Sequence, residues 1–210
     1  MTQKLLIIGA GSVGKFVAYN INQFIQSFEI IGFLDDDASK HNTIIAGVPV
    51  LGPVDKLQEF SGKDIAIVWG IAFPSIKKKL FDNYQNLSFQ FPNFIAKDAW
   101  VSEAVTFGKG CIVYPGTTIN YETAIDDFVV INMNCSLGHN CSIQSFSSLA
   151  PGVNLGGNTA IGCCVEMGIG SSTLQGITIA DDATVGGQAM VISNVSDADV
   201  VVGVPAKSIK

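Results

Sequence analysis

The feature that most constrains this chain is a six-residue repeat that fills its second half. From Ile95 to Val191 every sixth residue is bulky and apolar, and Thr173 is the one exception. The residue four places after each of these positions is small or β-branched, and the phase never slips. Helices repeat every 3.6 residues and half-buried strands alternate every two, so neither accounts for a strict period of six.

A six-residue period predicts a parallel β-helix, in which each hexad forms one short side of a coil. Three sides make an eighteen-residue coil, so the seventeen hexads that start from Ile95 to Val191 give between five and six coils. Inward residues stack on the equivalent residues one coil away and build a continuous core. The period does not fix the handedness, because right-handed crossovers dominate among parallel strands in general.

The first half of the chain is typical of an α/β fold instead. Short apolar runs predict strands, and apolar residues at helical spacing predict helices. We expect strands over 4–8, 29–34 and 64–69, helices over 13–28, 54–60 and 75–84 (the last one solvated), and a loop through 47–52. The change of pattern divides the chain into an α/β domain over residues 1–92 and a β-helix domain over residues 93–210.

Composition excludes several classes of function. The formal charge is −6, with 12 basic residues against 18 acidic ones and no basic tract, which argues against a nucleic-acid partner. No apolar run approaches the roughly 18 residues of a membrane span, and the N-terminal run is too short for a secretory signal, so we expect a cytoplasmic protein without a membrane partner. Five cysteines without a C-x-x-C pair argue against a disulfide framework and a zinc site, and we expect no metal.

A glycine-rich loop, Gly9-x-Gly11-x-x-Gly14, separates the first expected strand from the first helix. Such glycines let backbone N–H groups approach a phosphate at the helix N-terminus. Asp35 follows Gly14 by 21 residues, so the motif alone would also suit a nicotinamide-dependent enzyme. Only about three strands precede the hexads, whereas a dinucleotide fold needs two such halves, so we expect a mononucleotide site. A glycine turn without a ligand is the alternative.

Four segments in this order resemble the nucleotide-sugar acetyltransferases of the hexapeptide-repeat family, including members that make bacillosamine-type sugars or O-acetylate sialic acid. The segments are Ile7-Ile8-Gly9-Ala10-Gly11, Gly32-Phe33-Leu34-Asp35-Asp36, Gly47-Val48-Pro49-Val50-Leu51-Gly52 and Val202-Gly203-Val204-Pro205-Ala206-Lys207. The resemblance implies a Rossmann-like α/β subdomain followed by a left-handed parallel β-helix. It also implies acetyl-CoA as co-substrate and a homotrimer with active sites between subunits.

The resemblance assigns binding residues to each substrate. For the UDP or dTDP group of a nucleotide sugar it implies Gly9, Gly11, Ser12, Gly14, Asp35 and Asp36. For acetyl-CoA it implies Gly157, Gly168, Gly186, Gly187, Pro205 and Lys207, with Lys207 facing a CoA phosphate. The alternative for the glycines of the second set is that they only fit the corners of the coils.

The resemblance also makes His139 the catalytic base. It follows Leu137-Gly138 at a hexad position that should point outward. Imidazole, with an unperturbed pKa of ~6.5, can take a proton from a sugar amine near neutral pH. Gly156 or Gly157, one coil later, could supply a backbone N–H to a tetrahedral oxyanion. The other histidine, His41, lies in a polar loop and is expected to be a solvated surface residue.

The chain departs from the family pattern directly after His139. Asn140 stands where relatives carry an acid, and Ser148 stands where many carry a second histidine. Asn140 can orient His139 but cannot stabilise an imidazolium charge, and Asp126, Asp127 or a neighbouring subunit are candidates to compensate. A cysteine nucleophile is not expected, because three of the cysteines fall at small inward positions, namely Cys111, Cys135 and Cys141.

These observations predict an acetyl-CoA-dependent N-acetyltransferase that acts on the amine of a UDP- or dTDP-linked amino sugar in bacterial surface glycan biosynthesis. Transfer would be direct, with His139 and Asn140 at the reacting centre. One alternative is an O-acetyltransferase for a sialic-acid-like sugar. A second is a non-catalytic β-helix binding protein, which Asn140 favours.

Overall fold

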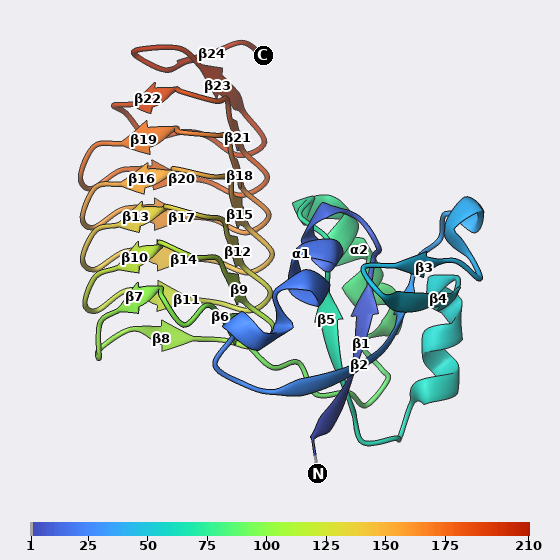
Figure 1. Ribbon diagram of the computed structural model, residues 1–210. Helices are drawn as coiled ribbons and strands as arrows, with labels where there is room; N and C mark the ends of the chain where they lie inside the picture. Colours follow the sequence, from blue (N-terminus) through green and yellow to red (C-terminus); the bar gives the residue numbers. More distant parts are fainter. Residues whose placement is uncertain (1) are drawn as a thin grey trace. The chain divides into compact units, whose positions relative to one another are not determined.

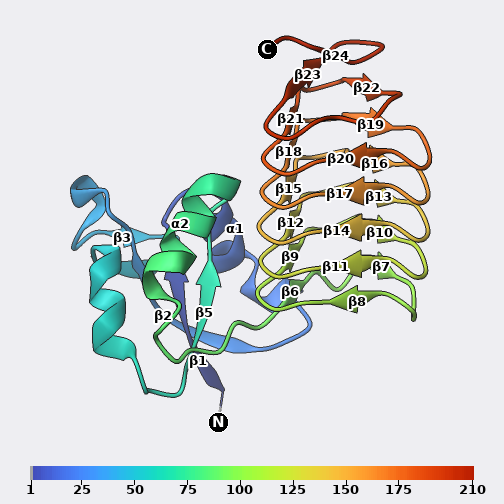
Figure 2. The same ribbon diagram turned by 180° about the vertical axis from the view of Figure 1, so that it is seen from behind.

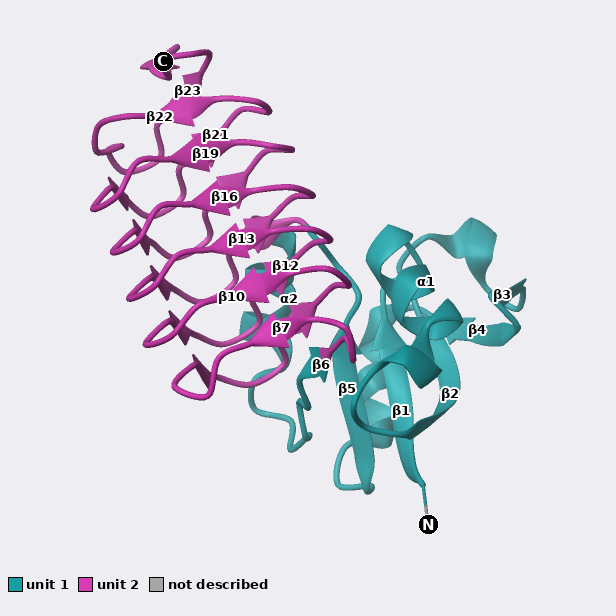
Figure 3. Ribbon diagram, turned by 60° about the vertical axis from the view of Figure 1, so that its left-hand side comes forward, with its two compact units in different colours: residues 1–72, 76–94 teal, residues 73–75, 95–210 magenta. Residues whose placement is uncertain are grey.

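The structure, a computed structural model, describes residues 2–210 and divides the chain into two compact units (Figure 3). The first unit comprises Met1–Ala72 and Ile76–Phe94, and the second comprises Phe73–Ser75 and Ile95–Lys210. None of the described helices is long and apolar enough to cross a membrane.

The first unit is built on one sheet with the strand order β3-β4-β2-β1-β5 (Figure 1). The three strands expected from the sequence are present and parallel: β1 (Gln3–Ile8), β2 (Phe28–Leu34) and β5 (Ile65–Trp69). Each carries apolar residues that are buried in the core, and β5 is buried along its whole length. The helical elements are α1 (Ser12–Tyr19), η1 (Ile21–Gln23), η2 (Ala38–Lys40), η3 (Val54–Phe60) and α2 (Pro74–Tyr84).

Three expectations for the first unit are wrong in detail. The helix expected over 13–28 ends at Tyr19: its C-cap, Asn20, leaves the helical backbone conformation (φ −113°, ψ 18°), and the Asn20 side-chain amide donates to the carbonyl of Phe16. The loop expected through 47–52 is a hairpin of β3 (Ile44–Ile45) and β4 (Val48–Gly52), and β4 pairs with β2. In α2, expected to be solvated, Lys77 is buried.

The second unit is a parallel β-helix whose short strands recur every six residues and form three faces (Figures 1 and 2). The first face holds β7 (Trp100–Val101), β10 (Thr118–Ile119), β13 (Ser136–Leu137), β16 (Asn154–Leu155), β19 (Ser172–Thr173) and β22 (Met190–Val191). The second holds β8 (Thr106–Phe107), β11 (Ala124–Ile125), β14 (Ser142–Ile143), β17 (Ala160–Ile161) and β20 (Thr178–Ile179). The third holds β6 (Phe94–Ile95), β9 (Ile112–Val113), β12 (Val130–Ile131), β15 (Ser148–Leu149), β18 (Glu166–Met167), β21 (Thr184–Val185), β23 (Val200–Val202) and β24 (Lys207–Ser208).

From β7 to β22 the register confirms the hexad prediction, because strands pair in parallel with those eighteen residues later, for example Ile119 with Leu137. At the end of the coil the register changes: β21 pairs with β23 sixteen residues later, and β24 runs antiparallel to β23. The residues predicted to face inward form one continuous buried core. Thr173, the exception to the apolar rule, is also buried, and its hydroxyl lies 3.0 Å from that of Thr159. The polar exception is therefore satisfied inside the coil rather than turned outward.

Candidate active site

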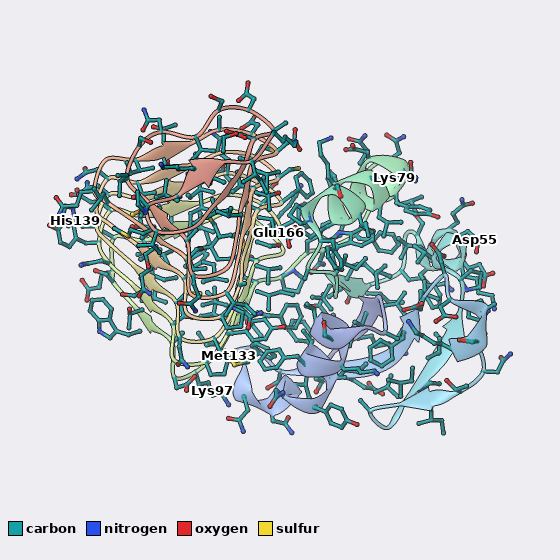
Figure 4. The ribbon with its side chains drawn as sticks, turned by 90° about the horizontal axis from the view of Figure 1, so that it is seen from above. Asp55, Lys79, Lys97, Met133, His139 and Glu166 are labelled. Atoms are coloured by element: carbon teal, nitrogen blue, oxygen red, sulfur yellow. The ribbon has the colours of Figure 1, made fainter. Side chains whose placement is uncertain are left out.

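His139 lies at the corner of the coil where the first face turns into the second. Equivalent corners in successive coils comprise residues 102–105, 120–123, 138–141, 156–159 and 174–177, which we call the His139 edge. Figure 4, which looks down on the coils, shows the His139 side chain at the outer surface of the β-helix, as the hexad position predicts.

The His139 ring is held between the coils on either side of it. The Tyr121 ring, eighteen residues earlier, stacks on it with ring centroids 5.3 Å apart and an interplanar angle of 9°. Gly157, eighteen residues later, lies next to Nε2, Cε1 and Cδ2 of the imidazole: a Cβ added to Gly157 would be 2.8 Å from His139 Nε2. Only a glycine at position 157 leaves room for the ring in this position.

A chain of two hydrogen bonds connects His139 to a carboxylate. His139 Nδ1 lies 2.8 Å from Asn140 Oδ1, and Asn140 Nδ2 donates to Glu122 Oε2 at 2.6 Å. Glu122 was not among the residues expected to compensate for Asn140. Asp127, which was, instead accepts the backbone N–H of Lys109, and Ser148 lies on the third face rather than on the His139 edge.

The backbone of the next coil presents a donor beside the imidazole. The carbonyl of Gly156 points into the core, where it accepts the Thr159 hydroxyl at 2.6 Å. A peptide group is planar and trans, so the N–H of Gly157 in the same group points away from the core. One coil below His139 the equivalent N–H, that of Tyr121, is capped by the Asn120 side chain at 2.8 Å. Gly156 has no side chain that could accept the N–H of the next residue. The Gly157 N–H therefore has no acceptor within residues 2–210.

Of the two backbone donors expected from the sequence, the structure therefore favours Gly157. The N–H of Gly156 is already bonded to the Thr173 hydroxyl at 3.1 Å. The cysteines contribute no nucleophile to this edge. Cys111, Cys135 and Cys141 are buried as expected, and burial raises the pKa of the Cys135 thiol to about 11.

The glycine-rich loop occupies the carboxyl end of β1, where ligands of open α/β sheets bind. A Cβ at Gly14 would lie 1.9 Å from the carbonyl oxygen of Gly9, so Gly14 brings α1 close to the strand. Gly11 caps α1 without a side-chain hydrogen bond, and a Cβ there would meet nothing within 4 Å. Space beside Gly11 and Ser12 is thus open to a ligand. A shallow hollow of about 430 Å³ lies at the other end of β1, beside Lys4 and Lys63.

Asp35 and Asp36 follow β2 at the same edge of the sheet. Asp35 Oδ2 accepts the N–H of Ala10 inside the glycine-rich loop at 2.7 Å and pairs with Lys40, while Asp36 Oδ1 accepts the N–H of Val54 at 2.8 Å. Both carboxylates therefore hold the loops around the expected nucleotide site. His41, expected to be solvated, is half-buried and its Nε2 lies 2.7 Å from the carbonyl oxygen of Asp35, which requires Nε2 to carry the proton.

We expect Asp35 to stabilise the fold in a pH-dependent way. Partial burial opposes its ionisation, but the N–H groups of Asp37 and Ala10 and the ammonium of Lys40 hold the pKa of Asp35 below its ordinary value of 3.8. A carboxyl whose pKa is lowered in the folded state stabilises the fold at pH values above its ordinary pKa. This stabilisation is lost as the pH falls through the lowered pKa. Denaturant unfolding should therefore show Asp35→Asn to be less stable than wild type at pH 7, with the difference shrinking below about pH 4. A difference that grows on acidification would contradict this.

The residues expected to bind acetyl-CoA lie in the later coils and the C-terminal tail, and they differ in whether packing alone explains them. A Cβ at Gly168 would be 2.5 Å from the N atom of Gly187, and one at Gly186 would be 2.7 Å from Val202. These two glycines are explained by coil stacking alone. Gly187, Pro205 and Lys207 are exposed and remain available to a ligand. Within the described residues no group of three or more His, Cys, Asp or Glu side chains could hold a metal ion.

Comparison with known proteins bears on both units. Residues 4–84 match the family described as the PglD N-terminal domain. The acetyltransferase domain of PglB from Neisseria gonorrhoeae, solved with acetyl coenzyme A, is 30% identical with a TM-score of 0.91 over 100% of both chains. PerB from Caulobacter crescentus, solved with CoA and GDP-perosamine, is 27% identical with a TM-score of 0.90 over 99% of this chain and 97% of that one.

Two curated proteins each match part of the chain. UDP-3-O-acylglucosamine N-acyltransferase of Campylobacter lari is 33% identical over 93 residues, which are 44% of this chain and 27% of that protein. Serine acetyltransferase of Staphylococcus xylosus is 30% identical over 120 residues, which are 52% of this chain and 53% of that protein. The matches thus span between about a quarter and a half of these curated relatives.

A Rossmann-like α/β unit followed by a left-handed β-helix, in a chain that matches solved acetyltransferases from end to end, defines a β-helix acyltransferase. The handedness that the period left open is thereby settled. The chain belongs to the hexapeptide-repeat nucleotide-sugar acetyltransferases, which confirms the resemblance found in the sequence.

Proposed function

We propose that this protein transfers the acetyl group of acetyl-CoA to the amine of a nucleotide-linked amino sugar. The observation that carries the proposal is that His139 Nε2 lies next to Gly157, whose N–H has no acceptor within residues 2–210, on one outer edge of the β-helix. One group can accept a proton and the other can stabilise an oxyanion. The ligands of the solved relatives, acetyl coenzyme A in one and CoA with GDP-perosamine in another, support the same reaction class.

In the proposed reaction His139 accepts the amine proton at Nε2 as the nitrogen attacks the thioester carbonyl. The Gly157 N–H stabilises the negative charge that develops on the carbonyl oxygen. When the tetrahedral intermediate collapses, the C–S bond breaks and the new C–N bond remains. The proton held by His139 leaves with the CoA thiolate as a thiol. No covalent intermediate on the protein is needed, which agrees with the burial of Cys135 and Cys141.

For the nucleotide we propose the site at the carboxyl end of β1, with backbone N–H groups of Gly11 and Ser12 at the phosphates. Gly9, Gly14, Asp35 and Asp36 shape this site through the contacts described above. The relative that binds GDP-perosamine shows that the base need not be uracil or thymine in this family. We therefore leave the base open among UDP, dTDP and GDP.

Two glycine variants should separate packing from binding at this loop. Gly14→Ala forces a Cβ against the Gly9 carbonyl, and we expect it to lower the free energy of unfolding by about 3 kcal/mol or more. Gly11→Ala has room for its Cβ and an extended backbone, so it should unfold like wild type. The added methyl should still obstruct a phosphate and weaken nucleotide-sugar binding at least about tenfold. Thermal unfolding and calorimetric titration measure the two effects, and unaltered binding to Gly11→Ala would exclude this loop.

For acetyl-CoA we propose Gly187, Pro205 and Lys207 as contacts, with Gly168 and Gly186 shaping the coils beneath them and Gly157 at the thioester. We further propose a homotrimer, in which exposed apolar side chains of the β-helix such as Trp100, Ile169 and Leu174 would be covered. A cytoplasmic location follows from the proposed use of acetyl-CoA. Bacterial surface glycan synthesis is the process in which such a sugar would be consumed.

The proposal is tested by incubating the protein with acetyl-CoA and a panel of UDP-, dTDP- and GDP-linked 4-amino sugars. Thiol release measures turnover, and mass spectrometry locates the acetyl group. Matched 4-hydroxy sugars serve as controls. N-acetylation of one amino sugar, without turnover of its hydroxy counterpart, is the expected result. Turnover of the hydroxy sugars alone would replace the proposal by O-acetylation, and no turnover with any acceptor would reject it.

A further inference from the structure

We propose that Glu122 is the positioning carboxylate of this site, and that it acts through Asn140, from one coil away, to hold His139 in the tautomer whose Nε2 accepts a proton. The inference rests on the proposed function, in which His139 is the base. It addresses a position where the chain departs from the family pattern, because Asn140 replaces the acid expected beside the histidine.

The argument starts from what each group can donate. An ionised carboxylate only accepts hydrogen bonds, so Glu122 Oε2, 2.6 Å from the Asn140 amide, must face the NH₂ group. The amide oxygen of Asn140 then faces the other way and lies 2.8 Å from His139 Nδ1. An amide oxygen cannot donate, so Nδ1 carries the proton and Nε2 keeps its lone pair.

Without Glu122 the Asn140 amide would have no such preference. Its oxygen and nitrogen have nearly the same shape, so the group can turn over with little steric change. The NH₂ group would then donate to Nδ1, and the ring proton would move to Nε2. That is the nitrogen beside Gly157, so the lone pair needed by the proposed base would be lost. Glu122 therefore selects between two states of the imidazole that have the same ring position.

The coil geometry aligns Glu122 with Asn140. The Asn140 N–H donates to the Tyr121 carbonyl at 3.0 Å, which fixes the register between the two corners. Glu122 and Asn140 both have a left-handed backbone, with φ of 54° and 56°. The equivalent corners above are Asn158 and Gly176, residue types that tolerate this conformation well.

The first experiment reads the tautomer directly, independently of catalysis. The chain contains only two histidines, so ¹⁵N NMR of the side chains at high pH gives two imidazole patterns. His41, with its proton on Nε2, is the internal reference. We expect wild-type His139 to be protonated at Nδ1, and Glu122→Gln to shift it toward Nε2 protonation. Glu103→Gln is the matched control, since Glu103 is exposed on the same edge one coil further away. An Nε2-protonated wild type, or a pattern unchanged by Glu122→Gln, would overturn the proposal.

The second experiment moves the charge along the relay. Glu122→Gln should lower kcat at least about tenfold with little change in KM for acetyl-CoA, because the amount of correctly protonated base falls. In the double variant Asn140→Asp/Glu122→Gln, the aspartate accepts from both His139 Nδ1 and the new glutamine amide. We expect it to restore both the tautomer and kcat. A double variant as slow as Glu122→Gln, or one in which His139 stays protonated at Nε2, would contradict the relay.

The two proposals fail separately. If wild type transfers no acetyl group but Glu122→Gln still shifts the His139 tautomer, the relay holds and the function proposed above is rejected. If transfer occurs and His139→Ala abolishes it while Glu122→Gln has no effect on tautomer or kcat, the function holds and Glu122 has no part in it. Thermal unfolding of each variant shows whether the coil is intact.

Discussion

Replacing His139 by alanine is expected to lower kcat for acetyl transfer to an amino sugar by about 10²–10⁴-fold, the usual contribution of a general base. His139 Nε2 lies next to Gly157, 2.8 Å from a Cβ built on that residue, and alanine leaves no imidazole there to take the amine proton. The fold should not suffer, because the ring lies outside the core, where its neighbours Tyr121, Asn140 and Gly157 are on the same edge. Thiol-release kinetics measure the effect, and thermal unfolding checks the fold.

The pH profile makes this prediction specific to a base. In the alanine variant the substrate amine must lose its proton to water, so the residual rate should rise with pH more steeply than the wild-type rate. Acetyl-CoA binding by calorimetry should change little, because the ring is proposed to contact the reacting atoms only. Turnover that survives the substitution at neutral pH would remove His139 from the reaction. A loss confined to acetyl-CoA affinity would make it a binding residue instead.

The β-helix could be predicted almost residue by residue, because a hexad leaves no freedom in what faces inward. A slip of one residue would turn every buried side chain outward, so the phase of the apolar residues fixes the strands. Even Thr173, which breaks the rule, was correctly placed by its position. Its hydroxyl is tolerated because Thr159 and the Gly156 N–H meet it inside the coil.

The α/β unit was harder to predict, because local side chains end its elements. The apolar spacing that predicts a helix through residue 28 continues in the sequence, yet the helix ends where Asn20 leaves the helical backbone conformation and its side-chain amide donates to the Phe16 carbonyl. The hairpin of β3 and β4 turns through Ala46 and Gly47, both with positive φ. An Ala-Gly turn is a weaker signal than the Asn-Gly or Asp-Gly pairs that usually mark such hairpins.

The eighteen-residue coil length predicts which residues are neighbours at the site, but not which side chains interact. Adding eighteen to His139 leads to Gly157, and subtracting eighteen leads to Tyr121, with Glu122 beside it. The carboxylates expected to compensate, Asp126 and Asp127, precede His139 by 13 and 12 residues, whereas in a β-helix the nearest neighbours lie one coil of eighteen residues away. Spacing alone does not say which side chains meet, and the amide that links Glu122 to His139 becomes visible only in the structure.

Replacing Gly157 by alanine is expected to lower kcat by about 10²-fold or more while leaving stability unchanged, which separates this position from a packing glycine. The new Cβ would lie 2.8 Å from Nε2 and 2.9 Å from Cε1 of His139, so the ring must move. A ring at the surface moves cheaply, and Gly157 lacks the positive φ that would strain an alanine. The variant keeps its backbone N–H, so the loss would not come from deletion of the oxyanion donor. Steady-state kinetics and thermal unfolding measure the two quantities.

The double variant His139→Ala/Gly157→Ala decides how the methyl group acts. If it acts by displacing the imidazole, it has nothing to displace once the ring is gone, and the double variant should be no slower than His139→Ala alone. If instead the methyl group blocks the acyl carbonyl from the Gly157 N–H, the two losses multiply. The first outcome would place the two residues in one functional unit. The second would show that Gly157 contributes through its own contact with the substrate. Displacement of the His139 ring would then not explain the lower kcat of Gly157→Ala.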